Sequence, residues 1–361
     1  MRAFRDEAAL LTRVVSRVKM DTPHATWPTG SEYLVRLLAF IFIELWLFPW
    51  QVLAIIGYTA KVWWKTSPAK ISGTANEIVT ARLLMHTAGT RPDQPTARLV
   101  PHLPAFGTVI AWLFGSIGLA SRWSGYKPSW TEFPVTLPSV MNSMVGHRTG
   151  FFDRVLADAI DPKGRHPVKQ IVILGAGWDT RAWGLLADAN ARIFELDMPP
   201  TQSAKRAALE GAGLPADRVT FVETDFAAKT WLQAIVERGF DQALPTFFLW
   251  EGVTMYLSSE AVDAILDGVG RLAPGSRIAF DFLSRELLHA ETPFEKLGKL
   301  TKGAMKFYSN EPWRYGISTK PPVREHVERI VAAHGLELAD YEPFGPEDEA
   351  FGGVTVAVRR S

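Results

Sequence analysis

An apolar segment that runs into a glycine-rich turn constrains the fold more than any other part of the chain. Residues 171–174 are isoleucine, valine and leucine, and Gly175-Ala176-Gly177-Trp178-Asp179 follows them directly. Such a run predicts a strand buried on both faces, as in a parallel sheet, and the two glycines let backbone approach a ligand closely. We therefore expect a nucleotide-type ligand at this turn and a helix over Thr180–Ala189 behind it.

Asp179 narrows the choice of ligand. A dinucleotide places its pyrophosphate on the positive N-terminus of the first helix, where a carboxylate at Asp179 would repel it. Thr180 also stands where G-x-G-x-x-G has its third glycine. A ligand without phosphate and with a positive centre fits better, and S-adenosylmethionine, with its sulfonium, is such a ligand. A helix-capping role for Asp179 is compatible with this interpretation.

Expected strands and helices alternate through the remainder of the chain. Alternation of this kind predicts right-handed crossovers and a doubly wound parallel sheet. Two further strands at the end, beyond five parallel ones, are typical of a class I methyltransferase rather than of a dehydrogenase. The fold class is therefore α/β, Rossmann-like. The expected strands are 171–174, 191–197, 218–222, 245–250, 277–282, 337–341 and 353–359, and the later helices are 229–238, 259–272 and 323–334.

Acidic residues follow three neighbouring strands of this expected sheet. Asp197 ends the second strand, Asp225 and Phe226 follow the third, and Glu251 follows the fourth. Ligands of such sheets bind outside the carboxyl ends of the strands. Asp197 can accept from ribose hydroxyls, Asp225 from an adenine amino group with Phe226 against the ring, and Glu251 lies on the amino-acid side. A helix cap or a turn explains each acid taken alone, but their joint occurrence favours a cofactor site.

A long apolar run, Tyr33–Trp64, precedes this domain and is rich in tryptophan. Its length is that of a membrane span, its tryptophans resemble interfacial anchors, and Pro49 is expected to kink or break it. Basic residues flank both ends, so both flanks are expected on the cytoplasmic side. We therefore expect a re-entrant or interfacial helical pair hinged near Pro49, at the inner face of the membrane. A single span, a buried helix and an oligomer contact are the alternatives.

The second apolar stretch, Leu103–Trp123, is either a further membrane contact or a lid over the active site. We divide the chain into an N-terminal extension (1–70), a helical lid or substrate region (71–160) and a methyltransferase domain (161–361). A net charge of +1 does not suggest nucleic-acid binding, and the absence of cysteine excludes disulfides and thiolate metal sites. No metal cluster is expected, and the oligomeric state is left open.

Several motifs, taken in order, resemble the leucine carboxyl methyltransferase family, including its bacterial branch of small-molecule O-methyltransferases. LGAGWDTR, an acid-bearing strand and EGVTMYL are the most specific of them. The matching segments span roughly Gly73–Arg359 and are HRTGFFD (147–153), LGAGWDTRAW (174–183), FELDMP (194–199), TDF (224–226), EGVTMYL (251–257) and EPWRYG (311–316).

The resemblance implies roles for individual residues of an S-adenosylmethionine site. Arg148 matches the arginine that grips the methionyl carboxylate, and Gly175 matches the close backbone approach. The other expected cofactor residues are Gly177, Asp179, Asp197, Asp225, Phe226 and Glu251, while Tyr256 and Trp313 resemble pocket walls.

The expected activity is S-adenosylmethionine-dependent O-methylation of a small, lipophilic molecule. A carboxylate acceptor is ionised and needs no base, whereas a hydroxyl needs one, for which His147, His289 and Tyr256 are candidates. No catalytic residue is named. An NAD(P)-dependent oxidoreductase and a non-catalytic membrane-associated scaffold remain the alternatives.

Overall fold

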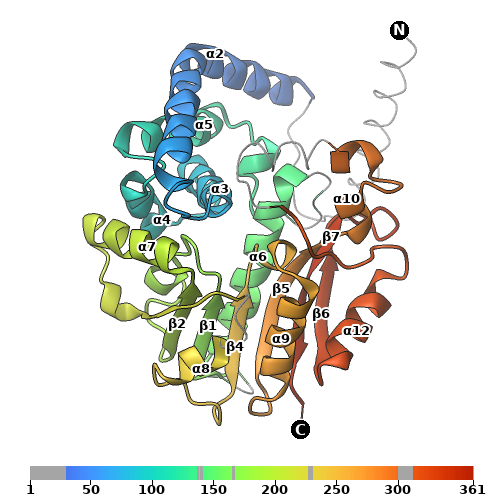
Figure 1. Ribbon diagram of the computed structural model, residues 1–361. Coiled ribbons are helices and arrows are strands. Elements are labelled where there is room, and N and C mark those ends of the chain that lie inside the picture. The colour runs from blue at the N-terminus through green and yellow to red at the C-terminus, as the bar shows by residue number, and fades with distance from the viewer. Residues whose placement is uncertain are drawn as a thin grey trace.

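The computed structural model describes residues 30–135, 138, 141–164, 167–226, 231–299 and 312–360. Its centre is a seven-stranded sheet in the order β3-β2-β1-β4-β5-β7-β6 (Figure 1). The first five strands are parallel and β7 is antiparallel to both of its neighbours. The strands are β1 (Gln170–Leu174), β2 (Arg192–Asp197), β3 (Thr220–Glu223), β4 (Thr246–Trp250), β5 (Arg277–Leu283), β6 (Glu337–Pro343) and β7 (Gly352–Val358).

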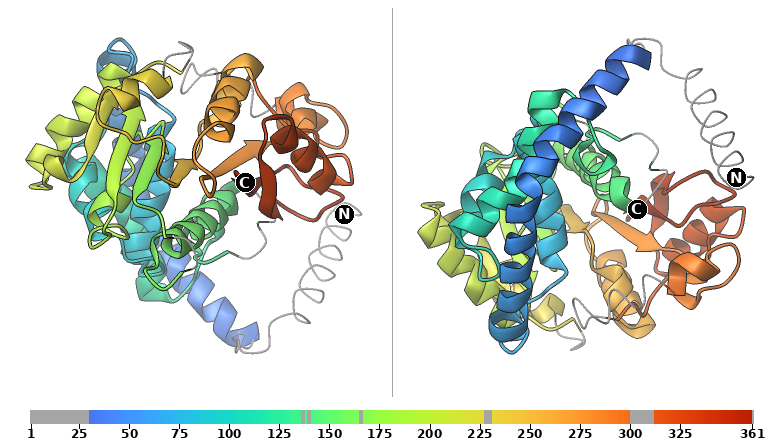
Figure 2. Two further views of the ribbon diagram at one scale, coloured as in Figure 1. Left: turned by 90° about the horizontal axis from the view of Figure 1, so that it is seen from below. Right: turned by 90° about the horizontal axis from the view of Figure 1, so that it is seen from above.

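Helices cover both faces of the sheet, as Figure 2 shows. Alternate residues of each central strand point to opposite faces. Ile171 and Ile173 of β1 join one apolar core with α6 (Met141–Ile160) and α7 (Pro199–Gly211). Val172 and Leu174 join the other with α8 (Trp231–Val236), α9 (Ser259–Gly270) and α12 (Val323–Ala333). This doubly wound arrangement confirms the expected class I methyltransferase fold.

A separate layer of helices lies over the carboxyl ends of β1 and β2 (Figure 1). It comprises α2 (Gly30–Lys61), a π-helical turn η1 (Val62–Thr66), α3 (Ala75–Ala88), α4 (Gln94–Leu99) and α5 (Thr108–Ser124). Helix α5 packs between α2 and α3. A Cβ at Gly118 of α5 would lie 2.6 Å from the carbonyl oxygen of Leu84 in α3, so only glycine permits this close approach. All described strands lie beyond this layer in the sequence, within residues 170–358.

Helix α2 contains Pro49 and yet is one helix of 32 residues. Figure 1 shows that it bends, as expected for a proline whose ring clashes with the preceding turn. The kink expected near Pro49 is therefore present, within one continuous helix and not between two separate helices, and the re-entrant or interfacial placement stays a prediction. Packing of both parts of α2 against α5 and the segment after it keeps the helix continuous. Most of α2 is exposed, so the structure does not show the buried helix that was one of the alternatives.

The structure describes all of Thr180–Ala189, and the helix expected there does not form. Only a 3-10 turn, η4 (Arg181–Trp183), forms there. The Asp179 side chain accepts from the backbone N–H of Arg181, and the Arg181 side chain turns inward to three carboxylates. These contacts and Gly184, which has non-helical angles, replace the helical hydrogen-bond pattern.

Candidate functional site

The glycine-rich turn lies directly after β1 and is held against β2. The backbone N–H groups of Gly175 and Ala176 both donate to the Leu196 carbonyl, at 2.8 and 3.1 Å. Gly175 and Gly177 have φ values of +65° and +45°, which disfavour any residue with a side chain. A Cβ at Gly175 would also lie 2.5 Å from the Val253 side chain. A Cβ at Gly177 would lie 2.9 Å from that of Ala75, so both glycines are required by backbone conformation and by space.

A cavity of about 330 Å³ opens at this turn, between the strand ends and the start of α3. Small-molecule sites commonly have a volume of this order or larger. Its ionisable lining is acidic, with Asp179, Asp197, Asp225 and Glu251 against two basic side chains, Lys70 and Arg82. The remaining lining includes Gly175, Gly177, Phe226 and Tyr256 from the expected site, and the apolar side chains of Ile78, Val79, Met198, Val253 and Leu257.

Asp197 is fixed at the end of β2 by two backbone donors. The N–H of Gly177 donates to Oδ2 at 2.6 Å and the N–H of Met198 donates to Oδ1 at 2.7 Å. A carboxylate oxygen can accept two hydrogen bonds, so these two backbone contacts are compatible with acceptance from a diol in the cavity. Asp225 and Phe226 follow β3 and line the same cavity, Phe226 being buried. The structure thus brings the three residues together as expected.

Asp179 and Glu251 belong to a buried cluster of ion pairs beside the cavity. Arg82 of α3 donates to Asp179 at 3.2 Å and to Glu251 at 2.8 Å. Arg181 also pairs with both carboxylates. Burial alone would raise the pKa of Glu251, but the guanidinium groups of Arg181, Arg82 and Arg148 lower it to about 2. The same competition, dominated by Arg181 and Arg82, leaves the pKa of Asp179 far below its usual value. Both acids are therefore ionised at neutral pH.

Arg148 of α6 lies behind this lining rather than in it. Its Nε donates to Glu251 at 3.3 Å and its Nη1 donates to Asp281 of β5 at 2.8 Å. Asp281 in turn accepts from the backbone N–H of Gly252 at 2.6 Å. A Cβ at Gly252 would lie 3.4 Å from Nη2 of Arg148, so the arginine packs directly against a glycine that lines the cavity. Its contact with a cofactor carboxylate stays a prediction.

Three other candidates, Trp313, His147 and His289, lie outside the cavity. Trp313, expected as a pocket wall, is not part of the cavity lining and packs against the apolar core that contains Ile171 and Ile173. His147 is buried, with Nε2 2.9 Å from Glu342, and His289 is exposed at the end of α10 (Arg285–His289). Glu195 faces α7, where Lys205 donates to it at 2.6 Å, and it does not line the cavity. Neither histidine is therefore placed to act as a base in the cavity.

Arg82 and Asp281, which complete the cluster, were not identified from the sequence. Arg82 is 2% exposed and Asp281 is fully buried. A charged residue within the apolar pattern of α3, and another within the apolar strand β5, were the available signals, because such residues are seldom buried without a partner. Among the described residues no group of three or more histidine or acidic side chains is arranged to hold a metal ion.

Comparisons with known proteins agree with this geometry. Residues 120–270 match the model of the leucine carboxyl methyltransferase family. A protein of Mycolicibacterium vanbaalenii named "Putative S-adenosyl-L-methionine-dependent methyltransferase" is 35% identical over 185 residues, which cover 51% of this chain and 56% of that protein. A relative of the same description in Mycolicibacterium smegmatis is 34% identical over 215 residues, or 55% of this chain and 70% of the relative.

The chain thus spans little more than half the length of the first of these relatives. A solved structure from Thermobifida fusca, titled as a putative methyltransferase, covers 73% of this chain and 94% of its own, with 16% identity and a TM-score of 0.47. The match to the second relative, over more than two thirds of that protein, places the sequence within the family. The chain belongs to the leucine carboxyl methyltransferase family of S-adenosylmethionine-dependent methyltransferases.

Proposed function

We propose that this protein transfers the methyl group of S-adenosylmethionine to an oxygen atom of a small, apolar acceptor. The acidic cavity at the Gly175–Gly177 turn carries the proposal. Asp179 and Glu251 are paired with arginines, so Asp197 and Asp225 carry most of the negative charge that attracts a cofactor with positive sulfonium and ammonium centres. The same charges repel the pyrophosphate of a nicotinamide dinucleotide, which disfavours the oxidoreductase alternative.

The residues of the chain would bind and orient the cofactor. Asp197 accepts the ribose hydroxyls while two backbone N–H groups hold it in place. Asp225 and Phe226 receive the adenine, and Glu251 with Arg148 receives the amino-acid end. S-adenosylmethionine supplies an already activated methyl group when bound, so the protein contributes mainly alignment and exclusion of water.

The acceptor is proposed to be apolar because part of the cavity lining is apolar. Ile78, Val253 and Leu257 line it together with Tyr256. None of the described residues lining the cavity is a histidine, and Tyr256 is the one phenol among them. A carboxylate acceptor is ionised at neutral pH and needs no base. For a hydroxyl acceptor, Tyr256 is the lining side chain placed to take part in proton removal.

We also propose that the protein works at the cytoplasmic face of a membrane, where apolar acceptors accumulate. Helix α2 and turn η1 form a 37-residue apolar stretch, long enough to cross a bilayer by length and composition, and 17% of its most apolar window is buried. An exposed surface of this kind is rare in proteins that stay in water.

Two measurements test the proposal. Calorimetry with S-adenosylmethionine and with NADH on wild-type protein and Asp197→Asn should give binding of the first ligand only, weakened in the variant. Lipid and metabolite extracts incubated with methyl-labelled cofactor should then yield a labelled product. Mild alkali separates the outcomes, because it releases the label from a methyl ester and not from an ether. Binding of NADH alone, or of neither ligand, would overturn the proposal.

A further inference from the structure

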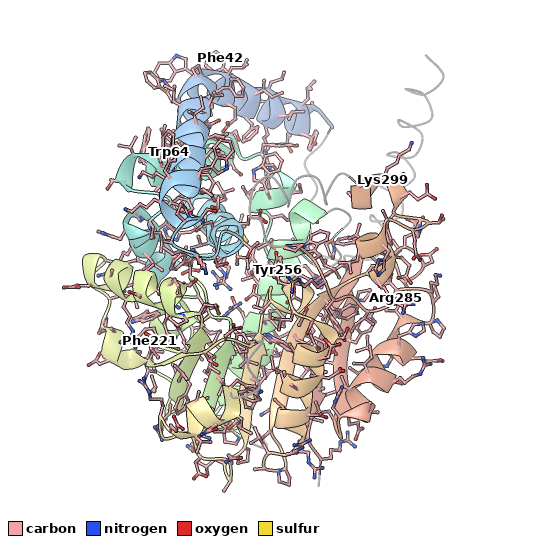
Figure 3. The ribbon with its side chains drawn as sticks, viewed as in Figure 1. Phe42, Trp64, Phe221, Tyr256, Arg285 and Lys299 are labelled. Carbon is pink, nitrogen blue, oxygen red and sulfur yellow. The ribbon has the colours of Figure 1, made fainter. Side chains whose placement is uncertain are left out.

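Large apolar side chains of α2, η1 and α5 are exposed on the outward side of the helical layer, and together they are here named the outer apolar surface. Phe42 and Trp46 of α2 and Trp64 of η1 are 74%, 78% and 82% exposed. Figure 3 labels Phe42 and Trp64 on the outer side of the helical layer. Trp112 and Trp123 of α5 are also exposed, and their separation of eleven residues places them on one side of that helix. The surface thus combines segments from two distant parts of the sequence.

Helix α2 is packed antiparallel to α5 along most of its length. Near its C-terminus, Tyr58 contacts Phe114 with ring centres 5.7 Å apart. Nearer the N-terminus, Phe40 contacts Tyr126, just beyond α5, at 5.2 Å. A helix that crosses a bilayer needs about 30 Å of its length surrounded by lipid or membrane-embedded protein. To cross a bilayer, helix α2 would have to separate from α5, or the whole helical layer would have to enter the membrane with it.

Polar groups of α2 are directed into this contact with α5. Gln51 is buried, and its amide donates to Glu44 at 2.9 Å and to Ser116 of α5 at 3.4 Å. Beyond Arg36, the exposed side of α2 is thereby left apolar. Separation of the two helices would expose the inner apolar side chains to water and leave Gln51 without Ser116. The contact therefore favours a helix that stays on the protein and offers one side to lipid.

We infer that the outer apolar surface inserts into one leaflet of a bilayer, with α2 lying in the membrane plane and not crossing it. A helix in this position buries its apolar side about 5–10 Å into the headgroup and acyl boundary. Tryptophan is favoured at that depth. Lys65 and Arg122 are exposed beside Trp64 and Trp123 in the sequence, and their charges favour anionic headgroups. This inference deepens the membrane contact of the proposed function and specifies its geometry.

The chain contains no cysteine, so single cysteines can report topology without background. Gly30→Cys and Lys65→Cys lie at the two ends of the apolar stretch, both exposed, and Gly30 has open space around it. In cells producing either variant, a membrane-impermeant maleimide should react in inverted membrane vesicles and not in intact cells. Reaction of Gly30→Cys from the outside would show that α2 crosses the bilayer and would overturn the inference.

A vesicle assay tests insertion itself. The triple variant Phe42→Ser, Trp46→Ser, Trp64→Ser should bind phosphatidylcholine–phosphatidylglycerol vesicles about tenfold or more weakly than wild type, because three large apolar contacts are lost. The matched control, Leu185→Ser with Leu244→Ser, removes exposed apolar side chains outside this surface and should bind like wild type. A fluorophore on Leu45→Cys should shift to the blue when vesicles are added.

Cofactor binding by the same variants separates this inference from the proposed activity. If the triple variant keeps cofactor affinity and loses vesicle binding, the surface is the membrane contact. Unchanged vesicle binding, or a wild-type dimer that the triple variant converts to monomer without any effect of lipid, would overturn the inference. If wild-type protein did not bind the cofactor, the methyltransferase proposal would be contradicted. The vesicle result would still test the membrane contact by itself.

Discussion

The guanidinium group of Arg82 donates to the carboxylate of Glu251 at 2.8 Å, and both side chains are buried. Arg82 belongs to α3 of the helical layer, whereas Glu251 follows β4 of the sheet. The pair therefore ties the layer that carries the outer apolar surface to the edge of the sheet that carries the cavity. Its loss would affect both stability and the shape of the site.

Replacing Arg82 tests this connection. Arg82→Met should lower the free energy of unfolding by about 3 kcal/mol, because it leaves two buried carboxylates with one partner fewer. Urea unfolding measures the loss, and calorimetry should show weaker cofactor binding. Arg154→Met is the matched control, since Arg154 pairs with Asp340 and Glu342 at the exposed surface. It should cost less than about 1 kcal/mol. Equal losses in the two variants would contradict a special role for Arg82.

Asp197→Asn should weaken S-adenosylmethionine binding by about tenfold to a hundredfold, because charge-assisted hydrogen bonds to the ribose contribute roughly 1.5–3 kcal/mol. Titration calorimetry gives the dissociation constant directly. Glu223→Gln provides the control: Glu223 is paired in register with Asp197 on β3, but it is exposed and does not line the cavity. If both substitutions weaken binding alike, the effect comes from overall charge and not from contact.

A methyl group at Gly175 should damage the turn. Gly175→Ala combines a φ of +65° with a Cβ 2.5 Å from Val253, and we expect a loss of about 2–4 kcal/mol of stability together with cofactor binding. Gly184→Ala is the comparison, because its Cβ would make only ordinary contacts at 3.7 Å or more. Thermal unfolding with and without the cofactor distinguishes the two variants. Full activity of Gly175→Ala would contradict the close packing of this turn.

Acid should destabilise the protein through Glu251. Its pKa is about 2 in the folded protein, against 4.5 for an ordinary glutamate. Between these values the unfolded chain binds more protons than the folded one, so the contribution of Glu251 is complete above about pH 4.5 and is lost as pH falls toward 2. Thermal unfolding between pH 3 and 5 should show a shallower pH dependence for Glu251→Gln than for wild type. Glu223→Gln should keep the wild-type slope.

The buried pair of Glu195 and Lys205 predicts the opposite change of stability with pH. Burial raises the pKa of Glu195 to about 7 although Lys205 lies at 2.6 Å, so ionisation of Glu195 opposes folding as pH rises from 4.5 toward 7. Lys205→Met should therefore destabilise the protein more at pH 8 than at pH 5, by about 3 kcal/mol at the higher pH. The double variant with Glu195→Leu should recover most of that loss, as urea unfolding at the two pH values would show.

Local sequence patterns predicted the sheet and the acids at its edge, because strand period and the carboxyl-end rule are short-range properties. Asp197, Asp225 and Glu251 meet at one cavity for this reason. The same patterns could not predict that Arg82 crosses from α3 to Glu251, since this pair is separated by 169 residues. Nor could they show that Arg181 would turn inward and replace a helix, or that packing on α5 would keep α2 continuous through Pro49.

Gly118 sets the spacing within the helical layer, because α5 meets the backbone of α3 there without an intervening side chain. Two helices in such close contact have little freedom to slide or separate. With α2 held in a leaflet as proposed, the cofactor cavity would remain at a constant height above the lipid surface. An acceptor would then have to rise from the bilayer by a fixed distance to meet the methyl group, so the length of the acceptor molecule would become a criterion of selection.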